Sequence, residues 1–197
     1  MKRLWILSCV LSAACSKTPE PDATTSSPPK STTEAAAPAP GRSAAPSAPA
    51  GPTDLAWDAP AAWQKSDNPS SMRKATYKIP KAPGDPEDAE LSVSQAGGTV
   101  EMNVKRWEAQ FDEKRGETQR DPRTIGDLKV TVIEVHGKFT GSGMPGAPPG
   151  PAKPGYALLG AIVETRPPHF FKLTGPEKTV LAAKPDFDKM VQSFRAK

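Results

Sequence analysis

The sequence predicts an α+β fold, in which helices cover a single, mainly antiparallel sheet of about five strands. Several segments alternate apolar with polar residues as half-buried strands do, and two others repeat apolar residues at helical spacing. The links between the later predicted strands are short, which favours antiparallel pairing. These patterns begin after residue 53, so we expect residues 54–197 to form one globular domain, long enough to bury a core.

Five segments have the pattern of a strand. In the first, Arg73, Ala75, Tyr77 and Ile79 alternate with polar residues, and Pro80 ends the segment. The five predicted strands are residues 73–79, 89–93, 128–139, 156–165 and 169–174. The charged segment 112–123 and the Pro/Gly-rich segment 141–155 are expected to be loops.

Two helices are expected. The first begins after Thr99, which can cap it, and its apolar residues fall within a narrow arc of the helix surface. The residues in this arc are Val100, Val104, Trp107 and Phe111. The second helix lies at the end of the chain, where apolar residues have the spacing i, i+3, i+4, i+7. Its apolar residues are Phe187, Met190, Val191 and Phe194.

Residues 1–15 have the order of a bacterial lipoprotein signal. A basic start precedes the apolar run 4–11, and Ser12-Ala13-Ala14 leads to Cys15. The run is too short to stay in a bilayer, which takes about 20 residues. The segment resembles the lipobox, in which Leu, a small residue and Gly or Ala precede Cys, although Leu11 stands one place further back here. The alternative is an ordinary secretory signal with a chance cysteine.

The lipobox resemblance implies a lipid anchor on Cys15. It implies cleavage after residue 14, a diacylglyceryl thioether on Cys15 and a fatty acyl group such as palmitate on its amine, and more than one chain anchors stably. Residues 1–14 are then the signal peptide. Such a protein is held in the bacterial cell envelope. In enteric bacteria Ser16 after the acylated cysteine would imply the outer membrane, facing the periplasm, although that rule varies between phyla.

Residues 15–53 are expected to form a disordered, lipid-anchored linker. They are mainly Pro, Ala, Ser and Thr, without aromatic or long aliphatic residues, so they cannot bury enough surface to offset the entropy of ordering. Frequent proline extends such a chain by about 3 Å per residue, which places the domain at most ~100 Å from the membrane. This composition is consistent with a spacer that spans the cell wall and equally with a solvated linker that has no such role.

Charge and cysteine content exclude several classes of site. Residues 54–197 hold 21 of the 26 Lys and Arg and 19 of the 22 Asp and Glu, a net charge of +2, which predicts no nucleic-acid partner. The two cysteines are Cys9, inside the signal, and Cys15, so the domain has no disulfide, thiolate nucleophile or thiolate metal site.

No catalytic or metal-binding constellation is expected in the domain. The dinucleotide-like pattern Gly141-x-Gly143-x-x-Gly146 is followed by prolines instead of a helix. The histidines, His136 and His169, have no neighbouring ligands in the sequence, and a metal site needs three or four. We therefore expect no catalytic residue, metal or cofactor.

Two segments are candidates for an interaction surface. Polar residues lie at one border of the apolar stripe of the first helix: Asn103 and Gln110, with Arg106 just beyond them. Such groups either satisfy loop backbone at the helix–sheet edge or line a shallow site. In segment 141–155, prolines could present a polyproline II surface with an apolar contact, although a tolerated insertion is the alternative. The residues concerned are Met144, Pro148 and Pro149.

The order of elements, the Trp57 and Trp63 lead-in and the helix around Trp107 together resemble a group of bacterial envelope lipoproteins of unassigned function. Their domain is similar to the PsbP-like α/β/α sandwich, and the resemblance covers residues 57–197. It implies the fold and no activity. We therefore expect a membrane-anchored lipoprotein with a non-catalytic domain that binds a protein or another partner in the envelope. The alternatives are a small envelope hydrolase and a small-ligand-binding protein.

Overall fold

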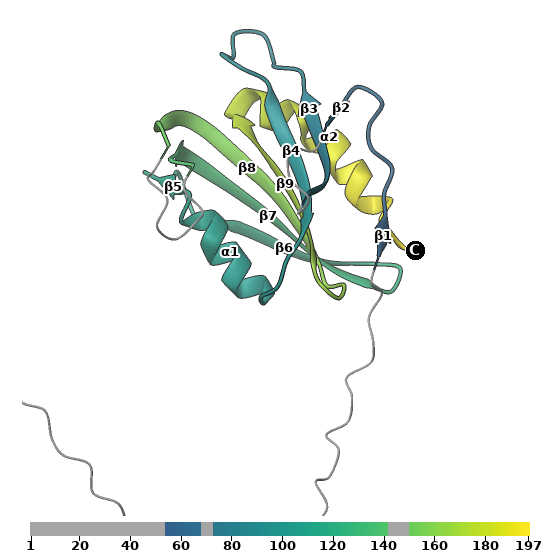
Figure 1. The fold of residues 1–197 in the computed structure, drawn as a ribbon. Coiled ribbons are helices and arrows are strands. Elements are labelled where there is room, and N and C mark those ends of the chain that lie inside the picture. The colour runs from purple at the N-terminus through teal and green to yellow at the C-terminus, as the bar shows by residue number, and fades with distance from the viewer. Residues whose placement is uncertain (1–53, 68–72, 142–149) are drawn as a thin grey trace, which may run out of the picture. The chain divides into compact units, whose positions relative to one another are not determined.

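The computed structural model describes residues 54–67, 73–141 and 150–197. Within these ranges the chain forms two helices, α1 (Val100–Glu108) and α2 (Glu177–Gln192), and ten strands (Figure 1). The strands are β1 (Leu55–Ala56), β2 (Gln64–Ser66), β3 (Arg73–Ile79), β4 (Ala89–Gln95), β5 (Phe111–Asp112), β6 (Gln119–Ile125), β7 (Leu128–Phe139), β8 (Lys153–Val163), β9 (His169–Pro176) and β10 (Arg195–Ala196).

Eight of the described strands form one sheet, in the order β2-β3-β4-β9-β8-β7-β5, with β6 also paired to β7. Every pairing in it is antiparallel, so the predicted α+β class with a mainly antiparallel sheet is confirmed. The five predicted strands correspond to β3, β4, β7, β8 and β9. The short strands β1 and β10 pair separately, which places the start of the described domain beside its C-terminus (Figure 1).

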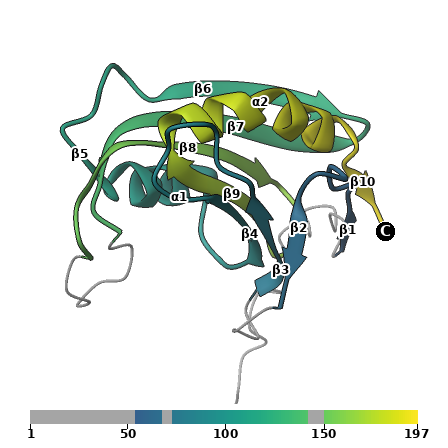
Figure 2. The ribbon, with the colours of Figure 1, turned by 90° about the horizontal axis from the view of Figure 1, so that it is seen from above.

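The two helices cover opposite faces of the sheet, as Figure 2 shows. On the α2 face, alternate residues of β4 and β9 such as Leu91, Val93 and Phe171 are fully buried and belong to the larger apolar core. Helix α2 adds Phe187 and Met190 to the same core. Burial of a large apolar side chain contributes about 1.5–3 kcal/mol, so this face supplies most of the hydrophobic stabilisation.

Helix α1 packs on the opposite face, over β7 and β8. Its first turn is capped as predicted, because the Thr99 hydroxyl accepts a hydrogen bond from the Met102 amide at 3.2 Å. Val104 and Trp107 are buried in a second apolar core with Ile133 and other residues of β7 and β8. The Trp107 ring lies against Gly160 of β8: a Cβ there would be no more than 3.0 Å from three ring carbons.

The structure corrects the prediction that residues 112–123 are a loop. Residues 119–125 form β6, which pairs with β7 along its whole length. The segment lies at the sheet edge, and most of its side chains are exposed, so it has no alternation of apolar residues. Pro122 fits an edge position, where a missing amide hydrogen need not break a ladder. Helix α1 also ends earlier than predicted, and Phe111 belongs to β5, although it still packs in the α1 core.

The signal peptide, Cys15, the linker and the loop residues Met144, Pro148 and Pro149 lie outside the described residues. Neither described helix has the length and apolar character needed to cross a bilayer.

The contact between Trp107 and Gly160 yields the first test. Gly160→Ala should lower the stability by about 1–3 kcal/mol, because the new methyl group forces the indole and α1 away from the sheet. Chemical denaturation measures the loss. Gly97→Ala is the matched control, since open space surrounds that position and its φ is ordinary, and it should be neutral or slightly stabilising. Equal effects of the two substitutions would contradict the proposed packing.

Candidate functional site

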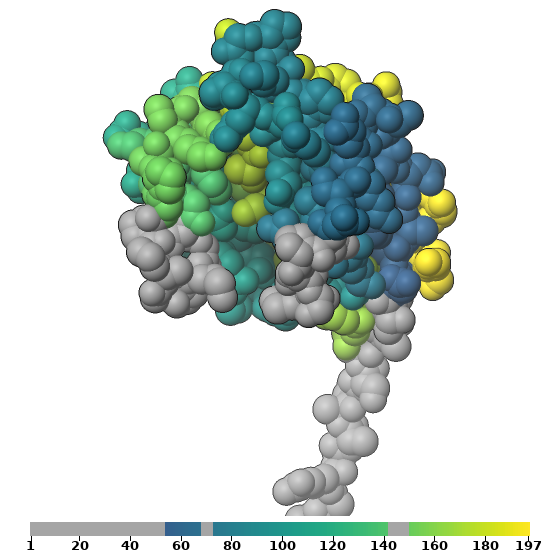
Figure 3. Space-filling model, turned by 45° about the horizontal axis from the view of Figure 1, so that its top comes forward, coloured from purple at the N-terminus to yellow at the C-terminus, as the bar shows by residue number. Residues whose placement is uncertain are grey.

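Helix α1 covers only part of its face of the sheet. On β4 and β9, the residues between the buried apolar ones are polar and point to the α1 side of the sheet. These residues are Glu90, Ser92, Ser94, Lys172 and Thr174. In Figure 3, which shows this face, atoms of β9 lie between the green atoms of β8 and the blue atoms of β3 and β4. The result is a polar groove beside α1 whose floor is β9, β4 and β3.

Two adjoining cavities make up this groove. The first, here called the mixed cavity, has a volume of about 350 Å³ and is lined by acidic and basic residues. These include Glu87, Asp88, Glu90, Lys153 and Tyr156. The second, here called the basic cavity, has a volume of about 260 Å³ and lies against α1. Its lining includes Ser94, Asn103, Arg106 and Trp107. Arg73, Ser92 and Lys172 line both.

Lys172 lies at the junction of the two cavities. Its ammonium group donates a hydrogen bond to the Gln110 Oε1 atom at 3.0 Å and lies 5.9 Å from the centre of the Phe139 ring. Among the described residues, no carboxylate lies within ion-pair distance of it. Burial, and then the charge of Arg73, lower the pKa of Lys172 below its ordinary value of 10.5, although Glu90 opposes the shift. Lys172 is therefore a partly buried cation without an anionic partner in the described structure.

Three polar residues were predicted at the border of the apolar stripe, and two of them, Asn103 and Arg106, line the basic cavity, whereas Gln110 does not. Asn103 donates a hydrogen bond from Nδ2 to the Thr99 carbonyl at 2.9 Å, and its Oδ1 accepts one from Arg106 at 3.2 Å. Asn103 therefore bonds the backbone at the start of α1 and also lines the cavity. Gln110 contacts the cavity only through Lys172, whose ammonium group donates a hydrogen bond to the Gln110 side chain. The Gln110 carbonyl accepts hydrogen bonds from Thr140.

The charges of the mixed cavity are largely paired with one another. Arg73 lies 2.8 Å from Glu90, and Lys153 lies 2.5 Å from Glu87, which also accepts a hydrogen bond from the Tyr156 hydroxyl. Such partly exposed ion pairs are worth about 0–1 kcal/mol each and leave little net charge. The unbalanced positive charge of the groove thus lies at its α1 end.

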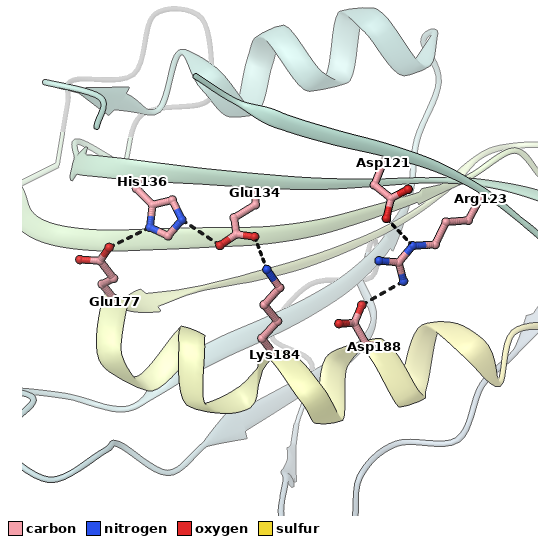
Figure 4. Close-up of polar contacts among 7 residues, drawn as sticks. All are labelled: Asp121, Arg123, Glu134, His136, Glu177, Lys184 and Asp188. Atoms are coloured by element: carbon pink, nitrogen blue, oxygen red, sulfur yellow. Dashed lines mark hydrogen bonds and ion pairs between the residues drawn. The ribbon is translucent and has the colours of Figure 1, made fainter. Parts of the chain in front are cut away.

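A second polar cluster lies on the α2 face, and its charges are fully paired (Figure 4). The His136 ring on β7 contacts Glu134 at 2.8 Å through Nε2 and Glu177 of α2 at 2.9 Å through Nδ1. An ionised carboxylate only accepts hydrogen bonds, so the ring satisfies both when both nitrogens carry protons. Lys184 of α2 also donates to Glu134, at 2.6 Å. Burial alone would raise the pKa of Glu134, but the hydrogen bonds from Lys184 and His136 lower it below 4.5.

The cluster continues along α2 through Arg123. This guanidinium on β6 lies 2.8 Å from Asp121 and 3.0 Å from Asp188 of α2 (Figure 4). The cavity beside it measures only about 70 Å³, which is too small for a substrate. We assign this cluster to holding α2 against β6 and β7.

The other histidine, His169, also has a structural role. His169 on β9 is fully buried, and its Nδ1 lies 2.6 Å from the Thr165 hydroxyl. Burial, and then nearby Lys74, lower the pKa of His169 to about 4, so the ring is neutral at pH 7. No group of three or more His, Cys, Asp or Glu residues within the described ranges is placed to hold a metal ion.

The sequence alone did not single out Lys172 or Arg73. In β9, Lys172 follows the strand alternation and looks like an ordinary solvent-facing lysine. Its importance comes from the pairing of β4 with β9 and from α1 lying beside it, and neither is visible in the local pattern. The polar residues that alternate along β4 were the available signal, since they mark one face of that strand as solvated.

Comparison with known proteins gives only distant structural similarities. No protein-family model matches the sequence, and no curated protein matches it either. Among solved structures, a protein of unknown function from Pseudomonas aeruginosa, PA94, is similar with a TM-score of 0.45 and 16% identity, over 68% of this chain and 85% of that one. The cyanobacterial PsbP protein CyanoP of Synechocystis is similar with a TM-score of 0.44 and 13% identity, over 78% and 99%.

The unpaired state of Lys172 predicts a characteristic pH dependence. Because its pKa is lower in the folded protein, unfolding takes up a proton, so its unfavourable contribution fades as pH rises through the folded-state pKa toward 10.5. Lys172→Met should be at least as stable as the wild type at pH 7, and the wild type should gain on it at alkaline pH. Denaturant titrations from pH 7 to about pH 10 measure the difference. Lys129→Met, at an exposed position of β7, should show no such trend. A pH-independent difference for Lys172→Met would contradict the lowered pKa.

Proposed function

We propose that this protein is a lipid-anchored lipoprotein of the bacterial cell envelope and that its domain is a non-catalytic binding module. The binding site in this proposal is the groove beside α1. The observation that carries it is the pair of cations Lys172 and Arg106, which line this groove without a carboxylate partner among the described residues. The cations of the α2 cluster, in contrast, are all paired.

The unpaired Lys172 favours binding, because a structural role would not require a partly buried ammonium group without an anion. A partly buried cation without an anion lowers stability, and the methyl-terminated Met would fill the same space. Sites of this kind are retained at some cost to stability when they serve recognition. The groove also combines polar donors with the aromatic side chains Trp107 and Phe170, a mixture found in ligand sites.

A small hydrolase is the second candidate, because Ser92 and Lys172 are direct cross-strand partners on this face. A lysine with a lowered pKa beside a serine can serve as a general base. Here, however, the Ser92 hydroxyl is directed to the Lys172 carbonyl at 3.4 Å, and the ammonium group donates to Gln110. The Ser92 hydroxyl and the Lys172 ammonium group thus form hydrogen bonds with other partners and not with each other, which favours binding over catalysis.

The proposed anchor is tested at Cys15. Wild-type protein should partition into the detergent phase after phase separation, and Cys15→Ala should leave the precursor unlipidated and move any processed protein to the aqueous phase. Cys9→Ala is the matched control, since Cys9 lies in the predicted signal, and it should keep the wild-type behaviour. Wild-type protein found wholly in the aqueous phase would refute lipidation.

The proposed binding site is tested by crosslinking in the native envelope. A diazirine-bearing residue at position Ser94, in the groove, should yield adducts with a protein or a small molecule after illumination, as detected by gel shift and peptide mass. The same residue at Lys178, exposed on α2, is the control and should yield few. Equal labelling from both positions, or none from the groove, would contradict the assignment of the groove as the binding site.

A further inference from the structure

The basic cavity differs from the rest of the described surface in its charges. Three cationic side chains line it, Arg73, Arg106 and Lys172, and none of the described carboxylates does. Four other arginines, in contrast, lie within ion-pair distance of carboxylates. These are Arg115, Arg120, Arg123 and Arg195.

The three cations come from separate elements that the fold brings together. Arg73 and Lys172 rise from β3 and β9 on the two sides of β4, and Arg106 extends from α1. The hydroxyls of Ser92 and Ser94 on β4 line the cavity between them. Charged and neutral hydrogen-bond donors therefore converge on one small space from two sides.

The cations differ in how far they are already neutralised. Arg73 is held by Glu90 at 2.8 Å, and Arg106 contacts only the neutral Asn103 amide oxygen at 3.2 Å. Lys172 contacts the neutral Gln110 side chain. An exposed cation can rely on water, but Lys172 is partly buried, so an anion beside it would replace solvation that the fold has removed.

We infer that the basic cavity binds a small molecule through an oxyanion, a carboxylate or a phosphate, held between Lys172 and Arg106. This inference rests on the proposed binding function and specifies its ligand class. The ligand must be small, because the cavity of about 260 Å³ is slightly smaller than the usual ligand pocket of about 300–1,000 Å³. Its body would contact Trp107 and Phe170, whose rings meet edge to face at 6.2 Å and form the apolar wall.

The experiment measures binding of three named probes, inorganic phosphate, pyrophosphate and citrate, to the full-length lipidated protein in neutral detergent. Isothermal titration calorimetry at low salt should detect at least one of them. Lys172→Met and Arg106→Gln should each weaken its binding by about tenfold or more, as expected for loss of one charge-assisted hydrogen bond. Stability of each variant is measured in parallel, so that unfolding is not mistaken for lost binding.

Lys105→Gln is the matched control, because it removes one positive charge from the neighbouring position of α1. Lys105 is exposed, lies 3.9 Å from Glu101 and does not line the cavity. Its binding constant should stay within about twofold of the wild type, since screening weakens the influence of an exposed distant charge. If no probe binds, or if all three variants weaken binding equally, the inference is overturned.

Two further outcomes separate this inference from the proposals on which it rests. Adducts at Ser94 without binding of any probe would overturn the oxyanion ligand and leave the groove as a binding site. Loss of both would overturn both. Sedimentation with phosphatidylglycerol vesicles tests the other source of phosphate, and phosphatidylcholine vesicles give the level of binding that the lipid anchor produces alone. Binding to phosphatidylglycerol above that level, if it is lost in Arg106→Gln and no soluble probe binds, would overturn the small-molecule assignment in favour of a lipid headgroup.

Discussion

The position of α1 depends on the contact between Trp107 and Gly160. An indole can lie this close to β8 only because Gly160 has no Cβ. The position of the Trp107 ring in turn fixes the position of the helix that carries it. Close packing of this kind leaves few alternatives, since interiors have the density of organic crystals. The contact fixes the short helix over β7 and β8, where Trp107 also meets Phe170 at the start of β9, and leaves the rest of β9, β4 and β3 without cover on the same face. The groove is thus a consequence of where one aromatic ring can lie.

The two faces of the sheet use charge in different ways. On the α2 face, buried and half-buried ions meet partners across the helix–sheet boundary, as Lys184 does with Glu134, and the cluster fixes α2 in its position. Breaking such a pair leaves an uncompensated charge, which costs more than the pair contributes. On the α1 face, Lys172 and Arg106 contact neutral amide groups. The charged groups of the α2 face therefore stabilise the packing of the helix. On the α1 face, the two cations beside the helix have no anionic partner among the described residues and are available to a ligand.

The main elements could be predicted from the sequence because their signals are local. Alternation along β3 and β4, the apolar run of β8 and the Thr99 cap each depend on residues close together in the chain. Strand β6 was missed because an edge strand exposes most of its side chains and lacks alternation. At the site, Asn103 and Arg106 were found from the helical periodicity of α1. Lys172 was not, because its role depends on the pairing of β9 with β4, and a strand order is a long-range property. The loop residues Met144, Pro148 and Pro149 stay untested, since they lie outside the described residues.

Ligand binding and stability should be linked through Lys172. Burial lowers the pKa of this ammonium group in the folded domain, so its charged form is destabilised until an anion lies beside it. An oxyanion would raise that pKa again and would stabilise the fold in proportion to the logarithm of its concentration relative to its dissociation constant. The same linkage implies that affinity falls as pH rises through the pKa of the free protein, because a neutral amine attracts the anion weakly. A guanidinium group carries its charge throughout this range, so a remaining, pH-independent part of the affinity would belong to the helix side of the cavity.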